Sequence, residues 1–207
     1  MESAGFHYTL DIPAGTPDCT VVLLHGSGRM EDDLISFGRT VFPKSVLYAP
    51  RGAVPWENGF AFFRRKPHRQ LDIDDLRHQA VVLCRFLNFV AQQTGQRPIL
   101  VGYSNGAIMA AETVCQDRHL SKAAILLRPL SPRKDRPLPS LAGYPILLLA
   151  GACDDRRHPS DAPHFAEQLA SAGADVVLET IDTGHGWAED AVDERLSRQW
   201  LARGSIA

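Results

Sequence analysis

A Gly-x-Ser-x-Gly motif, placed between a strand-like run and a helix-like run, constrains this chain more than any other feature. The motif reads Gly-Tyr-Ser-Asn-Gly at residues 102–106, after the apolar residues 98–101 and before the helix-forming residues 107–115. A serine on a sharp strand-to-helix turn needs small residues two positions to either side, because the turn presses those positions together. Alone, the motif would also fit a glycine-rich turn with a solvated serine. In its context it predicts a nucleophile elbow, with Ser104 exposed at the positive end of a helix.

The rest of the chain alternates short β-branched or leucine-rich runs with amphipathic stretches. This alternation is typical of parallel strands joined by crossover helices. We expect strands at residues 6–12, 20–24, 45–49, 98–102, 123–127, 146–150 and 175–181. We expect helices at residues 31–40, 73–93, 105–116, 160–172 and 187–203. The prediction is one α/β domain over residues 1–207, with a mostly parallel central sheet of about six or seven strands flanked by helices and no lid domain.

Composition and charge exclude several classes of function. The chain has 207 residues and a net charge of −2, and its basic residues cluster only at 64–66 and 133–136, so nucleic acid is not an expected partner. No apolar run approaches the ~18 residues needed to cross a bilayer, and the N-terminus resembles no signal peptide, which together predict a cytoplasmic protein without stable membrane insertion. The four cysteines form no Cys-x-x-Cys pair. We expect neither a metal nor a cofactor.

Three residues that follow predicted strands carry the expected chemistry. The carboxyl ends of parallel strands meet at one edge of a sheet, and Ser104, Asp154 and His185 each come just after such an end. Their order along the chain is that of the α/β-hydrolase fold. A serine needs a neutral imidazole to take its proton, and that imidazole needs a carboxylate to orient it. We predict His185 as the base and Asp154 as its partner, with Asp155 as the alternative carboxylate.

An oxyanion hole is expected from two backbone N–H groups. The residue after the nucleophile, Asn105, supplies one, and this fold takes the second from a loop after an earlier strand. Residues 25–28, His-Gly-Ser-Gly, occupy that place, so Ser27 is the expected second donor. His25 is expected to fill space behind this loop.

Candidate substrate-binding residues lie mainly in residues 50–71, a segment unusually rich in aromatics for a loop. Trp56, Phe60 and Phe62 would either pack down as structure or face an apolar acyl or aryl group. Arg64 or Arg128 would accept a carboxylate on the substrate, unless both are surface residues.

Several motifs together resemble the small carboxylesterase/phospholipase family of α/β hydrolases. They are Leu24-His25-Gly26-Ser27-Gly28, Asp32-Asp33-Leu34, Ala49-Pro50-Arg51-Gly52, the elbow, Gly151 to Asp154, and Gly184-His185. Phe62-Phe63-Arg64-Arg65 followed by Leu71-Asp72 is similar to the branch described as hydroquinone-linked carboxylesterases. Where that branch tends to have His-Pro this chain has Arg128-Pro129, and Trp187 stands where an aliphatic residue is common. We expect both differences to touch the acyl or alcohol pocket.

The resemblance and the residues together predict a serine carboxylesterase. Its partner would be a small-molecule ester, cleaved through an acyl-enzyme on Ser104. One alternative is an acyl thioesterase with the same three residues, and another is a noncatalytic ligand-binding protein on the same scaffold. The apolar loops also leave a homodimer open.

Overall fold

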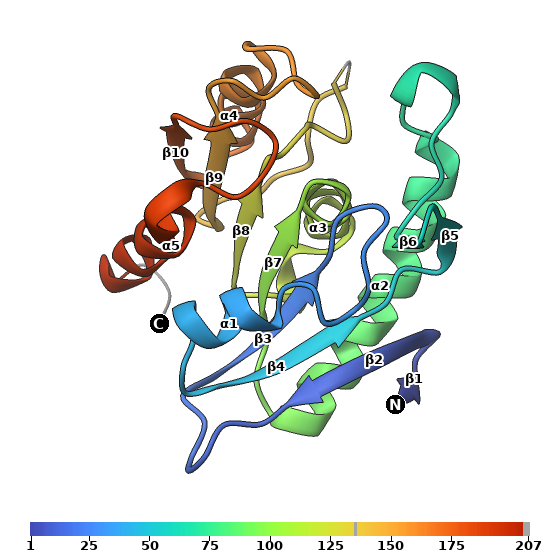
Figure 1. The fold of residues 1–207 in the computed structure, drawn as a ribbon. Helices are drawn as coiled ribbons and strands as arrows, with labels where there is room; N and C mark the ends of the chain where they lie inside the picture. Colours follow the sequence, from blue (N-terminus) through green and yellow to red (C-terminus); the bar gives the residue numbers. More distant parts are fainter. Residues whose placement is uncertain (135, 205–207) are drawn as a thin grey trace.

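The computed structural model describes residues 1–134 and 136–204 and has a central sheet of eight strands (Figure 1). The order across the sheet is β1-β2-β4-β3-β7-β8-β9-β10. All neighbours from β4 to β10 pair in parallel, whereas β1 and β2 add an antiparallel edge. The mainly parallel sheet is confirmed, and the two-residue β1 is an additional strand of this sheet that the sequence did not predict. The strands are β1 (Glu2–Ser3), β2 (Phe6–Asp11), β3 (Cys19–Leu24), β4 (Ser45–Pro50), β7 (Ile99–Tyr103), β8 (Ala123–Leu127), β9 (Pro145–Gly151) and β10 (Asp175–Ile181).

Five α-helices cover the two faces of the sheet in the described part of the chain. They are α1 (Ile35–Val41), α2 (Ile73–Thr94), α3 (Asn105–Gln116), α4 (Asp161–Ser171) and α5 (Val192–Ala202). α2, α3 and α4 pack against one set of strand side chains, including Leu24 and Leu100. α1 and α5 pack against the alternate set, including Leu23 and Val101. Successive strand residues point to opposite faces, so both faces of these strands are buried and the domain has three layers (Figure 1).

Local sequence explains where the longest helix begins and ends. The Asp72 carboxylate accepts a hydrogen bond from the N–H of Asp75 at the start of α2, and Gly95 ends the helix in the left-handed conformation. Leu76, Ala80 and Leu83 recur on its buried face. None of the described helices is both long enough and apolar enough to span a membrane.

Helix α5 begins five residues later than its sequence pattern predicts. The prediction started this helix at residue 187, but α5 starts at Val192. Asp190 and Ala191 adopt positive φ angles of 54° and 50°, which an α-helix cannot contain. A short 3-10 helix, η3 (Glu189–Ala191), therefore precedes α5.

The aromatic segment between β4 and α2 is an ordered hairpin. β5 (Val54–Trp56) pairs antiparallel with β6 (Gly59–Ala61), and a short 3-10 helix, η1 (Pro67–Arg69), follows. Phe60 pairs in turn with Arg29: the Phe60 N–H donates to the Arg29 carbonyl at 3.0 Å, and the Gly28 N–H donates to the Phe60 carbonyl at 2.9 Å. The hairpin is thereby attached to the loop after β3.

Candidate active site

Ser104 occupies a strained turn between β7 and α3. Its φ and ψ are 53° and −102°, and its N–H donates to the carbonyl of Leu127 on β8 at 2.8 Å. A Cβ atom on Gly106 would lie 2.0 Å from the carbonyl oxygen of Leu24, and one on Gly102 would lie 2.4 Å from the carbonyl oxygen of Gly106. Such contacts are far inside van der Waals distance. The sequence therefore needs glycine at both positions to hold the serine in this conformation.

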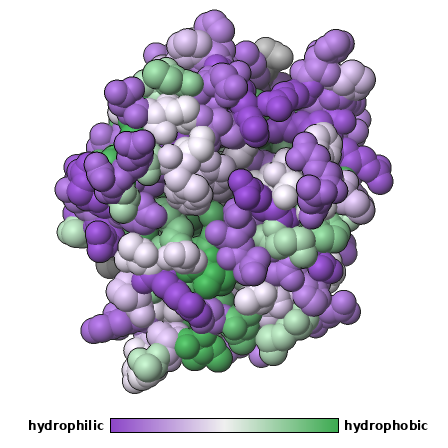
Figure 2. Space-filling model, viewed as in Figure 1, coloured by the Kyte–Doolittle hydropathy of each residue, from purple (hydrophilic) through white to green (hydrophobic). Residues whose placement is uncertain are grey.

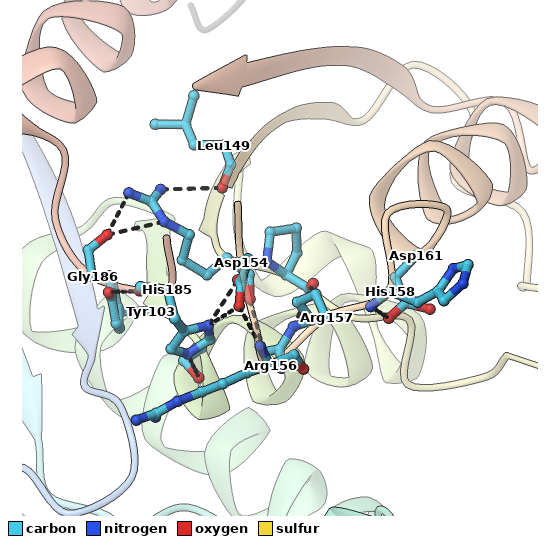
Figure 3. A network of polar contacts seen from close by, with 12 residues as sticks. Tyr103, Leu149, Asp154, Arg156, Arg157, His158, Asp161, His185 and Gly186 are labelled. Atoms are coloured by element: carbon cyan, nitrogen blue, oxygen red, sulfur yellow. Dashed lines mark hydrogen bonds and ion pairs between the residues drawn. The ribbon is translucent and has the colours of Figure 1, made fainter. Parts of the chain in front are cut away.

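The structure brings Ser104, His185 and Asp154 into one hydrogen-bonded chain. The Ser104 Oγ lies 2.8 Å from Nε2 of His185. The other ring nitrogen, Nδ1, lies 2.9 Å and 2.8 Å from the two carboxylate oxygens of Asp154 (Figure 3). The three residues follow β7, β10 and β9, so they meet at the carboxyl edge of the parallel sheet. A carboxylate on Nδ1 leaves Nε2 free to accept the hydroxyl proton.

Of the two candidate carboxylates, Asp154 is buried, whereas Asp155 is exposed. The Asp154 side chain is 2% exposed, and its Oδ1 also accepts the backbone N–H of Arg156 at 2.9 Å. Burial lowers the pKa of His185, while the hydrogen bond to Asp154 acts in the opposite direction. The nearby charges of Arg157 and Arg156 lower this pKa further. The imidazole is therefore held neutral, the state that a general base requires.

The loop that carries His185 is held from two sides. The hydroxyl of Tyr103, the residue before the elbow serine, donates to the His185 carbonyl. On the other side, Nε and Nη2 of Arg128 donate to the carbonyl of Gly186, at 3.2 and 2.7 Å. These bonds fix two successive backbone carbonyls that follow the His185 Cα atom (Figure 3). Tyr103 and Arg128, which do not belong to the Ser104–His185–Asp154 chain of hydrogen bonds, thus position the loop that carries the His185 ring.

Arg128 has a structural role, whereas the sequence suggested either that it binds a substrate carboxylate or that it lies on the surface. Its side chain is fully buried and pairs with Asp193 on α5, with Nη1–Oδ1 and Nη2–Oδ2 distances of 2.7 and 3.0 Å. A further bond reaches the carbonyl of Leu149 at 3.4 Å. With two bonds to Gly186, all five N–H donors of the guanidinium are occupied. It therefore has no donor left for a substrate carboxylate, and it is not a surface residue.

The expected oxyanion hole is framed by two buried side chains. His25 donates from Nδ1 to the Gly26 carbonyl at 2.7 Å, and its Nε2 accepts the Gly52 N–H at 2.9 Å. Both bonds fit a neutral imidazole, and burial lowers the pKa of this ring. The Asn105 side chain accepts the Phe62 N–H at 2.8 Å. Within the described residues, the backbone N–H groups of Ser27 and Asn105 have no recorded acceptor, as oxyanion donors require.

The aromatic candidates divide into buried and accessible residues. Phe62 is 1% exposed and packs on the His25 ring at 4.7 Å, so the expectation that it faces a substrate is wrong. Trp56 and Phe60 are partly exposed on the hairpin, with the Arg51 guanidinium over the Phe60 ring at 4.5 Å. Trp187 is 42% exposed. The rings of Trp56, Phe60 and Trp187 are thus partly accessible to solvent.

Trp187 forms a short aromatic stack beside the His185 loop. Its ring centroid lies 4.9 Å from that of Tyr103 and 5.4 Å from that of Phe37 on α1. The side chain of Arg64, by contrast, is exposed, while its backbone N–H donates to a carboxylate oxygen of Asp75 at 2.7 Å. Figure 2 shows that this view of the molecule is mainly hydrophilic, with apolar residues gathered in its lower central part.

Sequence reasoning missed three residues that support the site. Tyr103 lies inside the elbow motif, where its position was a signal that the side chain borders the site. Arg156 follows the predicted carboxylate by two residues and contacts it only through its backbone. Asp193 had no signal, because its role depends on Arg128, 65 residues earlier in the chain.

Comparison with known proteins decides the family. The chain is 34% identical over 190 residues to MhqD of Bacillus subtilis (strain 168), a protein provisionally named a hydrolase, and the match covers 90% of this chain and 94% of that protein. The chain belongs to the phospholipase/carboxylesterase-like family of α/β hydrolases. The crystal structure of a Mesorhizobium loti carboxylesterase has a TM-score of 0.88 and 30% identity, over 95% of this chain and 94% of that one. A Bacillus cereus carboxylesterase gives 0.87 and 26%, with the same coverage. No family model matches the chain.

Membership of this family of esterases and hydrolases agrees with the α/β-hydrolase fold predicted from the elbow and from the order of the strands. It supports an esterase or hydrolase function for the chain.

Proposed function

We propose that this carboxylesterase relative is a serine hydrolase that cleaves carboxylic esters through an acyl-enzyme on Ser104. The observation that carries the proposal is the chain of hydrogen bonds from Ser104 through His185 to Asp154. Each link has the length of a good hydrogen bond, and the central imidazole is held neutral. A solvated serine in a glycine-rich turn would need none of these partners.

In the first step the Ser104 oxygen attacks the ester carbonyl carbon while Nε2 of His185 takes the hydroxyl proton. The electron pair of the carbonyl π bond moves to the carbonyl oxygen, where the N–H groups of Ser27 and Asn105 would stabilise the negative charge. The buried Asp154 carboxylate stabilises the imidazolium that forms. The tetrahedral intermediate then collapses, its C–O bond to the alcohol breaks, and His185 returns the proton to the leaving oxygen.

Water completes the cycle by the same route. His185 takes a proton from the water, the resulting hydroxide attacks the acyl carbon, and Ser104 leaves with the proton from the imidazolium. The products are the alcohol and the carboxylic acid, and the enzyme returns to its starting state. The two steps together use only the ester, water and the side chains and backbone N–H groups named above.

The proposed substrates are esters with small or medium acyl or aryl groups. Trp187 offers a partly exposed ring directly after the His185 loop, and Trp56 and Phe60 are partly exposed on the hairpin. Such rings would bury an apolar group next to the reacting carbonyl. No lid domain covers the site within the described residues.

The decisive experiment is intact-mass analysis after treatment with a fluorophosphonate. We expect one adduct on the unmodified protein and none on Ser104→Ala, because only an activated serine reacts with this reagent. Hydrolysis of p-nitrophenyl hexanoate should disappear in the same variant. An adduct that persists in Ser104→Ala would refute the proposal. Comparing an oxyester with its thioester analogue would then separate an esterase from a thioesterase.

A further inference from the structure

His185 lies between two glycines that make few close contacts. A Cβ atom on Gly184 would meet no atom nearer than 3.7 Å, and one on Gly186 would meet none within 4 Å, apart from the adjacent residues. Close packing therefore does not fix either glycine, and glycine has the widest choice of backbone conformations. The ring must nevertheless bind Ser104 through Nε2 and Asp154 through Nδ1. Contacts from other segments have to hold this loop.

The segment that carries Asp154 is held differently before and after this residue. Before it, the backbone N–H groups of residues 152–153 donate to carbonyls of the segment 181–183, at 2.8 and 3.0 Å. After it, the chain borders a cavity of about 220 Å³ that Arg157 also lines. Packed side chains do not fill the space beside this part of the segment. Hydrogen bonds therefore have to fix it.

Arg157 supplies three of these hydrogen bonds. Its Nε donates to the Pro129 carbonyl at 3.0 Å and its Nη2 to the Arg128 carbonyl at 2.9 Å. Its Nη1 donates to the Arg156 carbonyl at 3.1 Å. A guanidinium holds its N–H groups in a rigid plane, so one side chain can bind several carbonyls that lie in different directions. Arg157 thereby joins the Asp154 segment to the residues that follow β8.

Arg128 continues this connection to the His185 loop. Its φ angle is 53°, in a region that residues with a Cβ atom rarely adopt. The hydrogen bond from its N–H to the Leu149 carbonyl at 2.7 Å, and the one that its own carbonyl accepts from Arg157, hold the backbone in this conformation. The Arg128 guanidinium then donates twice to the Gly186 carbonyl. A shift of this backbone would move the donors that hold the residue after His185.

These contacts close into a ring. Asp154 binds the His185 imidazole, and the carbonyl of the next residue, Gly186, binds Arg128. The Arg128 carbonyl binds Arg157, whose own N–H donates to the Asp154 carbonyl at 3.3 Å. Figure 3 shows Gly186 and Arg157 on either side of the Asp154–His185 pair. A connected network of satisfied hydrogen bonds is more rigid than a single bond between two loops.

The charge of Arg157 does not explain its position. It lowers the pKa of His185, which keeps the resting imidazole neutral. The same charge disfavours the imidazolium that forms when Ser104 attacks the ester. These two effects oppose each other, whereas the three hydrogen bonds act together to fix the loop.

We propose that Arg157 is a positioning residue: its three hydrogen bonds to backbone carbonyls fix the Asp154 segment relative to the His185 loop, so that the imidazole stays aligned with the serine. This inference rests on the proposed ester hydrolysis and adds to it a residue that touches neither the substrate nor the reacting atoms. Its effect passes through Arg128 and through the Asp154 segment. The planar arrangement of its N–H groups is the property that matters, and the charge is not.

Arg157→Lys tests this inference by keeping the charge and removing the planar donors. Lysine has a single nitrogen atom at the end of its side chain, so it cannot bind all three carbonyls in this geometry. With p-nitrophenyl hexanoate we expect kcat to fall by about ten- to a hundredfold, because small displacements of catalytic groups slow the chemical step. KM should change by less than about twofold, since ground-state binding of the substrate is not affected. The midpoint of kcat/KM against pH should stay at the wild-type value.

A second variant and a control isolate the effect. Arg157→Gln removes the charge as well, so kcat should fall by a similar factor and the pH midpoint should move to higher pH. Arg118→Lys is the matched control, because Nη1 of Arg118 also donates to a backbone carbonyl, that of Ala142, at 2.9 Å. These two residues precede β8 and β9, at the edge of the sheet opposite the site. The control should therefore leave kcat, KM and the pH midpoint unchanged.

The fluorophosphonate reaction separates positioning from stability. Each kcat is expressed per serine that the reagent labels at completion, so unfolded protein does not count. If the labelled fraction falls in Arg157→Lys but kcat per labelled serine equals that of the wild type, Arg157 only stabilises the fold and the inference is wrong.

Two further results would overturn the inference while the proposed function stands. A normal kcat in Arg157→Lys, with a loss only in Arg157→Gln, would mean that the charge acts. An increased KM with an unchanged kcat would mean that Arg157 contacts the substrate. If the wild-type protein forms no adduct and hydrolyses no ester, the proposed function itself fails, and with it the role assigned to Arg157.

Discussion

The buried pair between Arg128 and Asp193 should control both stability and the geometry of the site. The two side chains are 0% and 1% exposed. Asp193→Asn keeps the shape of the side chain but removes its charge, so the buried Arg128 guanidinium is left with uncharged acceptors only: one amide oxygen at position 193 and the carbonyls of Gly186 and Leu149. Removing one partner of a buried pair costs about 3–5 kcal/mol. For a chain of this length that corresponds to a loss in Tm of roughly 6–20 °C.

Urea denaturation followed by circular dichroism measures this loss directly, with Glu194→Gln as the control. Glu194 is the next residue on α5 and is partly exposed, so the same change of charge should alter stability by less than about 0.5 kcal/mol. The double variant Arg128→Met/Asp193→Leu should recover most of the stability, because apolar residues can replace a buried ion pair. Its kcat should stay low, since Gly186 then loses its donors. A loss below about 1 kcal/mol in Asp193→Asn would contradict the buried pairing described above.

Three further predictions follow from the site. Gly106→Ala places a methyl group against the Leu24 carbonyl and should lower the free energy of unfolding by about 1–3 kcal/mol. It should also remove most of the esterase activity, and denaturation and p-nitrophenyl ester assays would measure the two losses. Wild-type activity in this variant would disprove the tight turn. The lowered pKa of His185 predicts that kcat/KM rises with pH and levels off with a midpoint below about 6.5. Arg156→Gln removes a nearby positive charge and should move that midpoint to higher pH. An unchanged pH profile would show that the charge of Arg156 does not act on the imidazole. Tyr103→Phe removes the hydrogen bond to the His185 carbonyl and should lower the free energy of unfolding by about 0.5–1.5 kcal/mol. In ester assays it should lower kcat by a larger factor than it changes KM. Equal kcat in the wild type and the variant would show that the His185 loop does not need this hydrogen bond.

The elements that sequence predicted well have a strong local signal. Residues 105–116 and 175–181 form α3 and β10 with the predicted bounds. α3 follows an elbow whose two glycines allow the close backbone contacts described above, and β10 is a β-branched run that pairs with β9 along its whole length. The three residues of the hydrogen-bonded chain were found for the same reason, since each follows a strand that sequence alone placed.

The features that sequence did not predict depend on partners distant in the chain. β5 and β6 have three residues each, too few for a clear alternation, and are held by contacts with Gly28 and Arg29. The start of α5 depends on Asp190 and Ala191, which adopt the left-handed conformation. Both residue types are also found in helices, so the sequence did not reveal this break. The sequence could not decide whether Phe62 faces the substrate or the core, because the answer depends on its packing against His25, a residue distant in the chain.

The hairpin contacts described above set limits on how this enzyme can be redesigned. The side chains of His25, which lies two residues before the predicted donor Ser27, and of Asn105, itself a predicted donor, bind the backbone N–H groups of Gly52 and Phe62 at the two ends of the hairpin segment. Neither bond depends on the residues between those two positions. A library that varies the exposed tip at 57–58 and the neighbouring Trp56 would therefore change only the accessible surface of the hairpin, whereas a change of loop length that shifts Gly52 or Phe62 would disturb the backbone around the predicted oxyanion donors.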